Sequence, residues 1–410
     1  MKLHLSAQAA VISLCLSLLA SGEARAASFT FTKIADTNGP FSSFFSGNGF
    51  DRRGAAPSLN NGGTVAFEAG LDAGGSGIFT GNGTTTTTIA DTSGSFSRFG
   101  NDTSINDGGT VAFSAGLNGG YNDGIFTGNG TTTNTIISNI NENSLPQTRY
   151  SEPSINNSGI LAFRAVNRSE FILTSDGTNV TQIAQAGGNL PDPIINDVGT
   201  VAYDFVDKLI QTRNGTTTST IADATRDESS FVNPPSINNE GTVLYSRGSY
   251  GGGNTLLPLS QDLLTSNGTT TSTVADISGP FSDFRNYSIN DRGSVVFWAG
   301  LDAGGTGIFT GANPLSDKVI ATGDALFGST VTDLTFSLEG LNNSGSVAFF
   351  AQLADGTQGI FRAEPAVSQP AKTVPEPASA LGLIAFGALG AGAVRARKHK
   401  SAAKCVTSDA

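Results

Sequence analysis

The central part of this chain contains neither cysteine nor histidine. The 410-residue sequence has two of each, and all four lie near its ends: His4, Cys15, His399 and Cys405. Residues 28–377 therefore exclude disulfides, zinc sites built on Cys or His, cysteine nucleophiles and Ser-His-Asp triads, because each of these needs a thiol or an imidazole. The composition predicts a domain with no metal and no cofactor.

Positive charge is also scarce. Residues 28–377 keep 16 of the 23 Lys and Arg but 32 of the 34 Asp and Glu, which gives this part of the chain a net charge of −16. The few cations are spread along the sequence, so a polyanion would meet a repulsive field. We expect no nucleic acid among the partners.

The first 27 residues have the layout of a secretory signal peptide. Lys2 precedes an apolar stretch at 9–19, and a small-residue sequence at 24–27 follows it. This pattern predicts residues 1–27 as a signal peptide and export of the remainder.

The C-terminal region combines three features in a fixed order. A rigid, proline-flanked segment comes first, formed by Val374, Pro375, Glu376 and Pro377. An apolar stretch at 378–394 follows and has about the minimum length of a spanning helix. A basic cluster then begins, with Arg395, Arg397 and Lys398. Such clusters stay on the cytoplasmic side, which would leave the rest of the chain on the outer side of the membrane.

Together these features resemble the PEP-CTERM sorting signal that exosortase systems handle in Gram-negative bacteria, here at 375–400. The resemblance implies transit through the inner membrane, recognition by an exosortase-like membrane protease, and a final location on the cell surface or in the extracellular matrix. We expect a Pro- and Ala-rich linker at 365–374 and a cytoplasmic tail at 401–410. The alternative for 378–394 is an anchor that is never cleaved.

A motif of the form Asn-x-x-Gly-x-(Val/Leu)-x-(Phe/Tyr) occurs seven times, at intervals of 40 to 52 residues. Its Asn and Gly positions are Asn60 and Gly63, Asn106 and Gly109, Asn156 and Gly159, Asn196 and Gly199, Asn238 and Gly241, Asn290 and Gly293, and Asn342 and Gly345. An Asn that bonds the backbone after it and a Gly that accepts positive φ favour a tight turn between two strands.

Each repeat predicts four antiparallel strands. The motif turn joins the first two, and Asn82-Gly83 in the first repeat indicates a type I′ hairpin between the third and fourth. A four-stranded unit of this length is typical of a propeller blade. The sequence therefore predicts an all-β fold, a seven-bladed β-propeller at 28–364.

The two ends of the repeat region complement each other. Residues 29–36 form a fourth strand with no repeat before it, while the seventh repeat stops after its third strand at 359–362. Pairing them would close the ring and protect both edges. A β-solenoid is the alternative fold, and it gives no reason for this complementarity.

The repeats resemble an uncharacterised bacterial surface family with N-x-x-G-x-V-x-F tandem repeats. The resemblance implies a propeller-like fold and a surface location, and it supplies no activity and no catalytic residue.

Phenylalanines recur where the chain is expected to cross between repeats. A Phe-Ser-x-Phe pattern places them at Phe41 and Phe44, Phe96 and Phe99, and Phe281 and Phe284. Exposed rings could stack on the sugars of an exopolysaccharide, but large apolar side chains are usually buried, so we favour packing between blades. The single tryptophan, Trp298, is expected in the core rather than as a sugar platform.

Acidic residues mark no catalytic or metal site. Calcium needs about six to eight converging oxygens, so single residues such as Asp72 and Asp302 fit turn capping better. A pair of carboxylates acting on a glycosidic bond is the one metal-free catalytic arrangement that the composition allows. No pair stands out, and Asp204 with Asp207 lies in the most divergent repeat.

The sequence thus favours a non-catalytic binding or structural role in contact with exopolysaccharide. The alternative is a carboxylate-dependent polysaccharide hydrolase or lyase on the same scaffold. Ligands are expected on the face that carries the crossings and the loops between second and third strands.

Overall fold

The structure is a computed structural model that describes residues 28–44, 56–117, 123–138, 148–188, 190–226, 228–231, 233–249 and 258–366. The predicted signal peptide (1–27) and the sorting signal (375–400) lie outside these residues. Within the described part of the chain, no helix has the length and apolar character that a membrane crossing requires.

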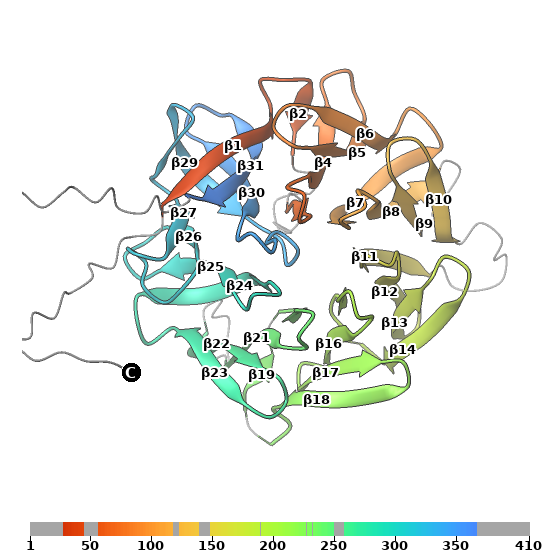
Figure 1. Cartoon of the computed structure of the whole chain (residues 1–410), viewed down its shortest axis with the longest axis vertical. Helices are drawn as coiled ribbons and strands as arrows, with labels where there is room; N and C mark the ends of the chain where they lie inside the picture. The colour runs from red at the N-terminus through yellow and green to blue at the C-terminus, as the bar shows by residue number, and fades with distance from the viewer. Residues whose placement is uncertain are drawn as a thin grey trace, which may run out of the picture. The chain divides into compact units, whose positions relative to one another are not determined.

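Seven antiparallel sheets surround one axis, as the blades of a propeller (Figure 1). The first blade holds β2 (Phe41–Ser43), β3 (Ser58–Leu59), β4 (Val65–Leu71), β5 (Ser76–Gly81) and β6 (Thr86–Asp91). The second holds β7 (Phe96–Ile105), β8 (Val111–Leu117), β9 (Asp123–Gly128) and β10 (Thr133–Ser138). The third holds β11 (Arg149–Ile155), β12 (Leu161–Val166), β13 (Glu170–Ser175) and β14 (Val180–Ala186).

The remaining blades follow the same plan. The fourth holds β15 (Ile194–Ile195), β16 (Val201–Phe205), β17 (Leu209–Asn214) and β18 (Thr217–Asp223). The fifth holds β19 (Ser230–Phe231), β20 (Ser236–Ile237), β21 (Val243–Ser249), β22 (Ser260–Ser266) and β23 (Thr271–Asp276). The sixth holds β24 (Phe281–Ile289), β25 (Val295–Leu301), β26 (Thr306–Phe309) and β27 (Lys318–Ala321). The seventh holds β28 (Ala325–Leu326), β29 (Ser329–Thr335), β30 (Val347–Leu353), β31 (Gln358–Pro365) and β1 (Phe29–Asp36).

The N-terminal strand closes the ring. β1 pairs antiparallel with β31, in a register that runs from Phe29 opposite Pro365 to Asp36 opposite Gly359. The first strand of the domain is therefore the outermost strand of the last blade (Figure 1). The predicted seven-bladed propeller closed by its N-terminal strand is confirmed.

Apolar side chains fill the spaces between blades. The second strand of each blade is buried over most of its length, as the sequence Val-Ala-Phe at the start of β4 and β8 requires. One core cluster joins Phe350 and Ile360 of the seventh blade to Phe41 and Phe67 of the first. All six crossing phenylalanines are buried, so packing between blades is the correct interpretation and sugar stacking by these rings is not.

The outer hairpin turns differ from the prediction. A type I′ turn needs positive φ at both central residues, but in the pair Asn82-Gly83 only the glycine has it, with φ of +96°. Asn82 Oδ1 instead accepts the N–H groups of Thr84 and Thr85, at 2.9 and 3.0 Å. The asparagine caps a four-residue loop with its side chain, so the type I′ assignment is wrong.

Removing β1 tests the closure. A chain that starts at Asp36 lacks the strand that covers β31, so it should self-associate through this edge or lose cooperative unfolding. Light scattering after size exclusion and thermal melting measure the two effects, with a chain that starts at Ser28 as the control. A monomer with unchanged melting would contradict the closed ring.

Candidate functional site

The seven motif asparagines form a closed ring of hydrogen bonds around the axis. Each buried side chain donates from Nδ2 to the backbone carbonyl of the motif asparagine in the next blade, over 2.9–3.2 Å. The last of these bonds joins Asn342 of the seventh blade to Asn60 of the first. Each Oδ1 also accepts the backbone N–H four residues later, at 2.8–3.0 Å. The motif asparagine thus fixes its own turn and the neighbouring blade together.

The motif glycines complete these turns. All seven have φ between +74° and +82°, which a residue with a Cβ rarely adopts. Their N–H groups donate to the carbonyl of the asparagine three residues earlier. The prediction of tight Asn-x-x-Gly turns therefore agrees with the backbone.

A second ring lies one residue further along. The residues after the motif asparagines alternate between amide and acid: Asn61, Asp107, Asn157, Asp197, Asn239, Asp291 and Asn343. Each backbone N–H donates to Oδ1 of the next member, at 2.8–2.9 Å. Six further bonds of 2.7–3.1 Å run from Asn Nδ2 to Asp Oδ2.

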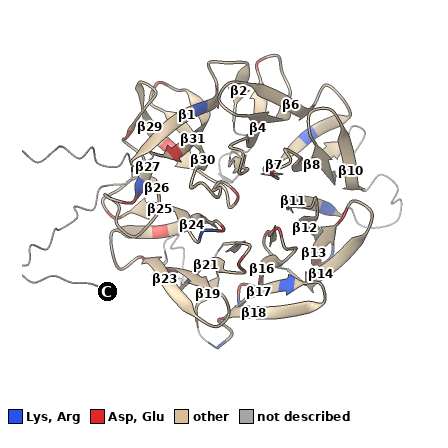
Figure 2. Cartoon of the chain, viewed as in Figure 1, with Lys and Arg blue, Asp and Glu red and all other residues tan. Residues whose placement is uncertain are grey.

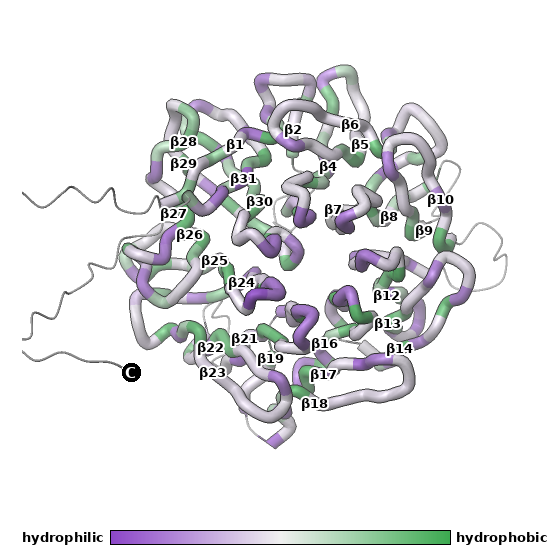
Figure 3. Tube along the Cα trace, viewed as in Figure 1, coloured by the Kyte–Doolittle hydropathy of each residue, from purple (hydrophilic) through white to green (hydrophobic). Residues whose placement is uncertain are grey.

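These two rings surround one mouth of the central channel. The turns are the hydrophilic segments at the centre of Figure 3, and several carry acidic residues in Figure 2. They line a cavity of about 150 Å³. Every carboxylate of the second ring accepts one backbone N–H and two side-chain amide N–H groups. These carboxylates therefore stabilise the turns around the mouth and are not arranged as an acidic binding site.

The segment 337–340 lies across the channel. Glu339 Oε1 accepts the hydroxyls of Ser104 and Ser154, at 3.0 and 2.7 Å, from the second and third blades. Its carbonyl accepts the N–H of Leu59 in the first blade, at 2.9 Å. Leu338 packs against core clusters that belong to the fourth, fifth and sixth blades. Burial raises the pKa of Glu339 to about 7, although the two serine hydroxyls oppose the shift.

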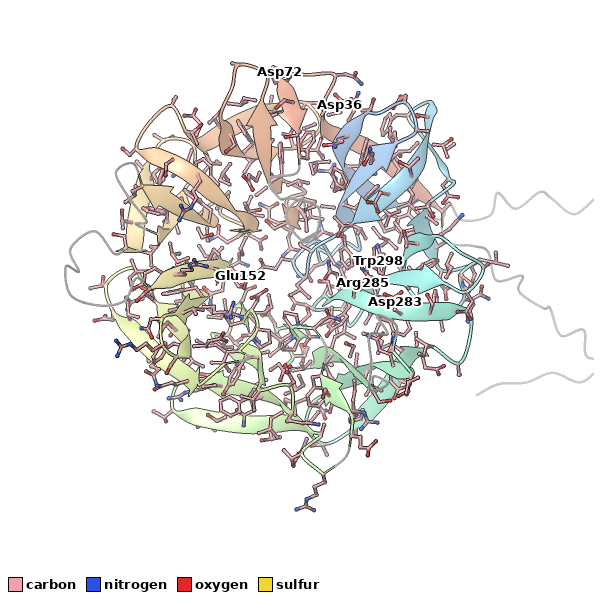
Figure 4. All side chains as sticks on the ribbon, turned by 180° about the vertical axis from the view of Figure 1, so that it is seen from behind. Asp36, Asp72, Glu152, Asp283, Arg285 and Trp298 are labelled. Carbon is pink, nitrogen blue, oxygen red and sulfur yellow. The ribbon has the colours of Figure 1, made fainter. Side chains whose placement is uncertain are left out.

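A small cavity lies on the other side of this segment. It has a volume of about 60 Å³, and its lining includes three acids from different blades, Glu152, Asp192 and Glu339. Glu152 has positive φ, at +57°, and lies near the axis in the view from behind (Figure 4). The cavity is far smaller than the range of about 300–1,000 Å³ usual for ligand sites.

A larger pocket lies between the first two blades. It has a volume of about 380 Å³ and is lined by Ser42, Ser43, Phe44, Glu68, Ala69, Gly70, Gly75, Ser76, Thr92 and Ser97. These residues belong to the Phe-Ser-x-Phe crossings, to the facing ends of β4 and β5 with the loop between them, and to the turn after β6. The pocket is therefore on the loop face, where the sequence predicts ligands.

The sixth blade has the same loops but different side chains. Trp298 replaces Glu68 there, and it is buried with Nε1 donating to the Leu334 carbonyl at 3.1 Å. The Arg285 guanidinium lies 4.9 Å from the centre of the indole and donates to Asp283 at 2.8 Å. Figure 4 shows these three side chains together in the sixth blade. The tryptophan is a core residue, as predicted, and not a sugar platform.

Strand-end aspartates act as turn caps. Asp91, Asp223 and Asp276 each accept a backbone N–H and a hydroxyl from the residue two positions later. These hydrogen bonds hold the pKa of Asp223 and Asp276 below the usual range. Over the residues that the structure describes, no group of three or more His, Cys, Asp or Glu is arranged to hold a metal ion.

Asp204 and Asp207 come close together but form no accessible pair. Asp204 is 1% exposed, and burial together with the charge of Asp207 raises its pKa to about 8. Its Oδ1 has no hydrogen-bond partner within the described part of the chain. Neither residue lines the cavities of about 60, 150, 380 and 570 Å³ that the described residues form.

The sequence did not predict two features of the site, the second ring and the segment 337–340. The alternation of Asn and Asp after the motif asparagine was visible, but its meaning depends on seven turns meeting at one axis. The sequence around Glu339 also departs from the repeat. Five repeats have a serine two residues before the motif asparagine, whereas the seventh repeat has Gly340 there, directly after Glu339. Its contacts with distant blades could not be read from local sequence.

These observations define a class of protein: an exported, seven-bladed β-propeller that carries a C-terminal sorting motif. The PEP-CTERM protein-sorting motif matches residues 373–398, which agrees with the resemblance predicted for 375–400. This motif is the signal that exosortase, a membrane protease, recognises for export and sorting across the inner membrane.

The chain belongs to the "Family of unknown function (DUF7453)", whose model matches residues 35–313 and 328–381. The resemblance to an N-x-x-G-x-V-x-F repeat family is not confirmed by this match and stays a prediction. No match was found among curated proteins.

Several solved structures are similar to this chain at low identity. An oligogalacturonate lyase in complex with manganese is 13% identical, with a TM-score of 0.48, over 83% of this chain and 96% of that chain. A puromycin hydrolase is 12% identical, with a TM-score of 0.48, over 76% of this chain and 53% of that chain. A chain of a mitotic checkpoint complex is 13% identical, with a TM-score of 0.46, over 86% of this chain and 98% of that chain. Similarity at this level carries no argument about the fold or the activity of this chain.

The asparagine ring should contribute measurably to stability. Asn238→Ala removes the amide bond to the Asn290 carbonyl, which keeps only the Gly293 N–H, and leaves the Thr242 N–H without its side-chain partner, which should cost about 2 kcal/mol of unfolding free energy. Asn267→Ala, which removes only an exposed turn cap, should cost less than about 1 kcal/mol. Urea denaturation measures both, and equal losses would contradict the special role of the ring.

Asp204 should make stability depend on pH. Its pKa is about 8 in the folded chain, whereas an unfolded Asp titrates near about 3.9. The folded state therefore binds more protons between these values, so the unfolding free energy should fall as the pH rises from about 4 to 8. Asp204→Asn should remove much of this fall and stabilise the protein at pH 8 by a few kcal/mol. Urea denaturation across this range is the measurement, and Asp276→Asn should bring no gain at pH 8, because hydrogen bonds lower the pKa of Asp276.

Proposed function

We propose that this protein is a non-catalytic propeller of the cell surface or extracellular matrix that binds exopolysaccharide through its loop face. Export and sorting follow from the PEP-CTERM motif. The binding role is supported by the way cavities and carboxylates are distributed over the propeller.

The main support is that acids and sugar-sized cavities do not coincide. Cleavage of a glycosidic bond by carboxylates needs two of them beside one sugar. The 380 Å³ pocket contains one acid, Glu68, and a further cavity of about 570 Å³, bounded by Phe29, Val274 and Pro365, contains none. Several acids line only the two smaller cavities, of about 60 and 150 Å³, and the aspartates of the larger of these two already accept the hydrogen bonds of the second ring. None of these cavities places two carboxylates beside a sugar.

Polar lining and position favour a saccharide for the 380 Å³ pocket. Five of its ten lining residues carry hydroxyl groups, which exchange hydrogen bonds with sugar hydroxyls in either direction. Its volume falls within the range of about 300–1,000 Å³ that small-molecule sites occupy. A polysaccharide of the matrix is the ligand that a matrix-sorted protein meets at high local concentration.

One observation favours the alternative of a hydrolase or lyase. Glu339 has a pKa of about 7, as a general acid would. Its Oε1 is already held by two serine hydroxyls and its backbone bonds the first blade, so the carboxyl group serves the channel-crossing segment. We therefore assign Glu339 a structural role.

The test is to incubate the purified propeller with the matrix polysaccharide of the producing cells. Co-sedimentation of the protein with the polysaccharide, without release of reducing ends, is the expected result. Release of reducing ends, abolished by Glu339→Gln, would establish the enzyme instead. Absence of co-sedimentation would overturn the binding role.

A further inference from the structure

Phe327 is the one exposed aromatic side chain in the part of the chain that the structure describes, and 54% of its surface is accessible. We propose that its ring is a stacking platform for one pyranose residue of the matrix polysaccharide. This inference rests on the binding role proposed above and adds the residue that makes the contact and the kind of contact. Single exposed apolar side chains are common on soluble proteins, but Phe327 differs in the way its backbone and its ring are held.

The backbone holds Phe327 in a conformation that its side chain disfavours. Phe327 and Gly328 form the two-residue turn between β28 and β29, where Leu326 pairs with Ser329. Both turn residues have positive φ, +46° and +88°, as a type I′ turn requires. Asn or Gly fits the first position of such a turn, whereas a bulky aromatic residue is strained there. Strain of this kind is found mainly at functional sites.

Packing alone would place an aromatic ring elsewhere. In the first, second and sixth blades, a buried phenylalanine of the first strand packs on one of the third strand, as Phe41 packs on Phe79 with ring centres 5.0 Å apart. In the seventh blade, Val331 occupies the position of Phe41. Phe327 covers Phe361 instead, and more than half of its own surface stays exposed.

The ring of Phe327 is fixed from behind. It stacks on the fully buried Phe361, with ring centres 5.6 Å apart and planes 20° apart. Phe361 covers one face of the ring, so the exposed surface lies on the side away from it. Sugar C–H groups carry a partial positive charge and pack well on the negative face of an aromatic ring. A ring that is already held in place loses little conformational entropy when a ligand binds.

A charged pair lies beside the platform. Lys33 Nζ is 5.9 Å from the centre of the ring and donates to Asp36 at 2.6 Å. The ammonium group has two further N–H groups that can donate to sugar hydroxyls. The hairpin is also on the loop face, because the Ala354 N–H of the loop between β30 and β31 donates to the Thr330 carbonyl at 2.8 Å. An aromatic face with hydrogen-bonding groups at its side suits a sugar, which has apolar C–H faces and a rim of hydroxyls.

The experiment uses oligosaccharides released from the matrix polysaccharide of the producing cells. They are titrated with the exported chain, and proton NMR follows the sugar C–H signals, which the ring current of a stacked aromatic side chain shifts upfield. Phe327→Leu keeps an apolar cover over Phe361 but has no ring, so it should abolish the upfield shifts and weaken binding about tenfold. Phe327→Tyr keeps the ring and should bind within about twofold of the unaltered chain.

Two further variants separate binding from stability. Leu315→Ala changes a side chain that is 85% exposed in the outer turn of the sixth blade, and it should leave binding unchanged. Phe327→Asn gives the turn a residue that suits positive φ, so it should lose the sugar contact without lowering the melting temperature. If Phe327 were only a cover for Phe361, Phe327→Asn would lower the melting temperature and leave binding intact.

The outcomes distinguish the platform from the binding role. Upfield shifts and binding that persist in Phe327→Tyr and are lost in Phe327→Leu support the platform. Binding that is unchanged in Phe327→Leu overturns the platform and leaves the binding role standing. Equal loss in Phe327→Tyr and Phe327→Leu also overturns stacking on the ring, and failure of the unaltered chain to bind overturns both proposals.

Discussion

One interaction holds the propeller together at its axis: an asparagine side-chain amide that donates to the backbone carbonyl of the equivalent asparagine in the next blade. A buried amide must satisfy both its donor and its acceptor, and here each does so by linking two blades and closing one turn. A shorter side chain such as serine could not reach the neighbouring carbonyl. A charged aspartate would have no N–H to donate. The repeated asparagine is therefore a requirement of the ring and not a binding motif.

The rest of the blade is free to vary because this constraint lies at the axis. The position directly after the motif aromatic illustrates the freedom, since it holds Glu68, Ser114, Arg164, Asp204, Ser246, Trp298 and Phe350 in the seven blades. These side chains point into the spaces between blades, where they create a pocket in one place and fill it in another. Function in such a scaffold is carried by the residues that break the repeat.

Sequence reasoning reached the fold because its signals are local or periodic. The seven turns, the strand pattern and the complementary ends can each be read within a few residues, and together they leave few other arrangements. The prediction of a type I′ hairpin was wrong because Asn-Gly satisfies two turn chemistries, and only the backbone shows that Asn82 uses its side chain. The channel-crossing segment escaped prediction because Glu339 bonds serines 235 and 185 residues away in sequence. The pocket escaped for a similar reason, since it depends on a volume left between two blades.

The number of blades affects the second ring, in which Asn and Asp alternate. Seven is an odd number, so strict alternation cannot close, and two amides must meet once, at Asn343 and Asn61. That junction keeps its backbone bond, from Asn343 N–H to Asn61 Oδ1 at 2.8 Å, but it has no carboxylate to bridge the two side chains. It joins the first blade to the seventh, the blade in which β1 pairs with β31. The propeller thus begins and ends in a blade next to the one junction of the second ring that lacks a bridging carboxylate. A circular permutation with termini at another junction would have to open a carboxylate-bridged one.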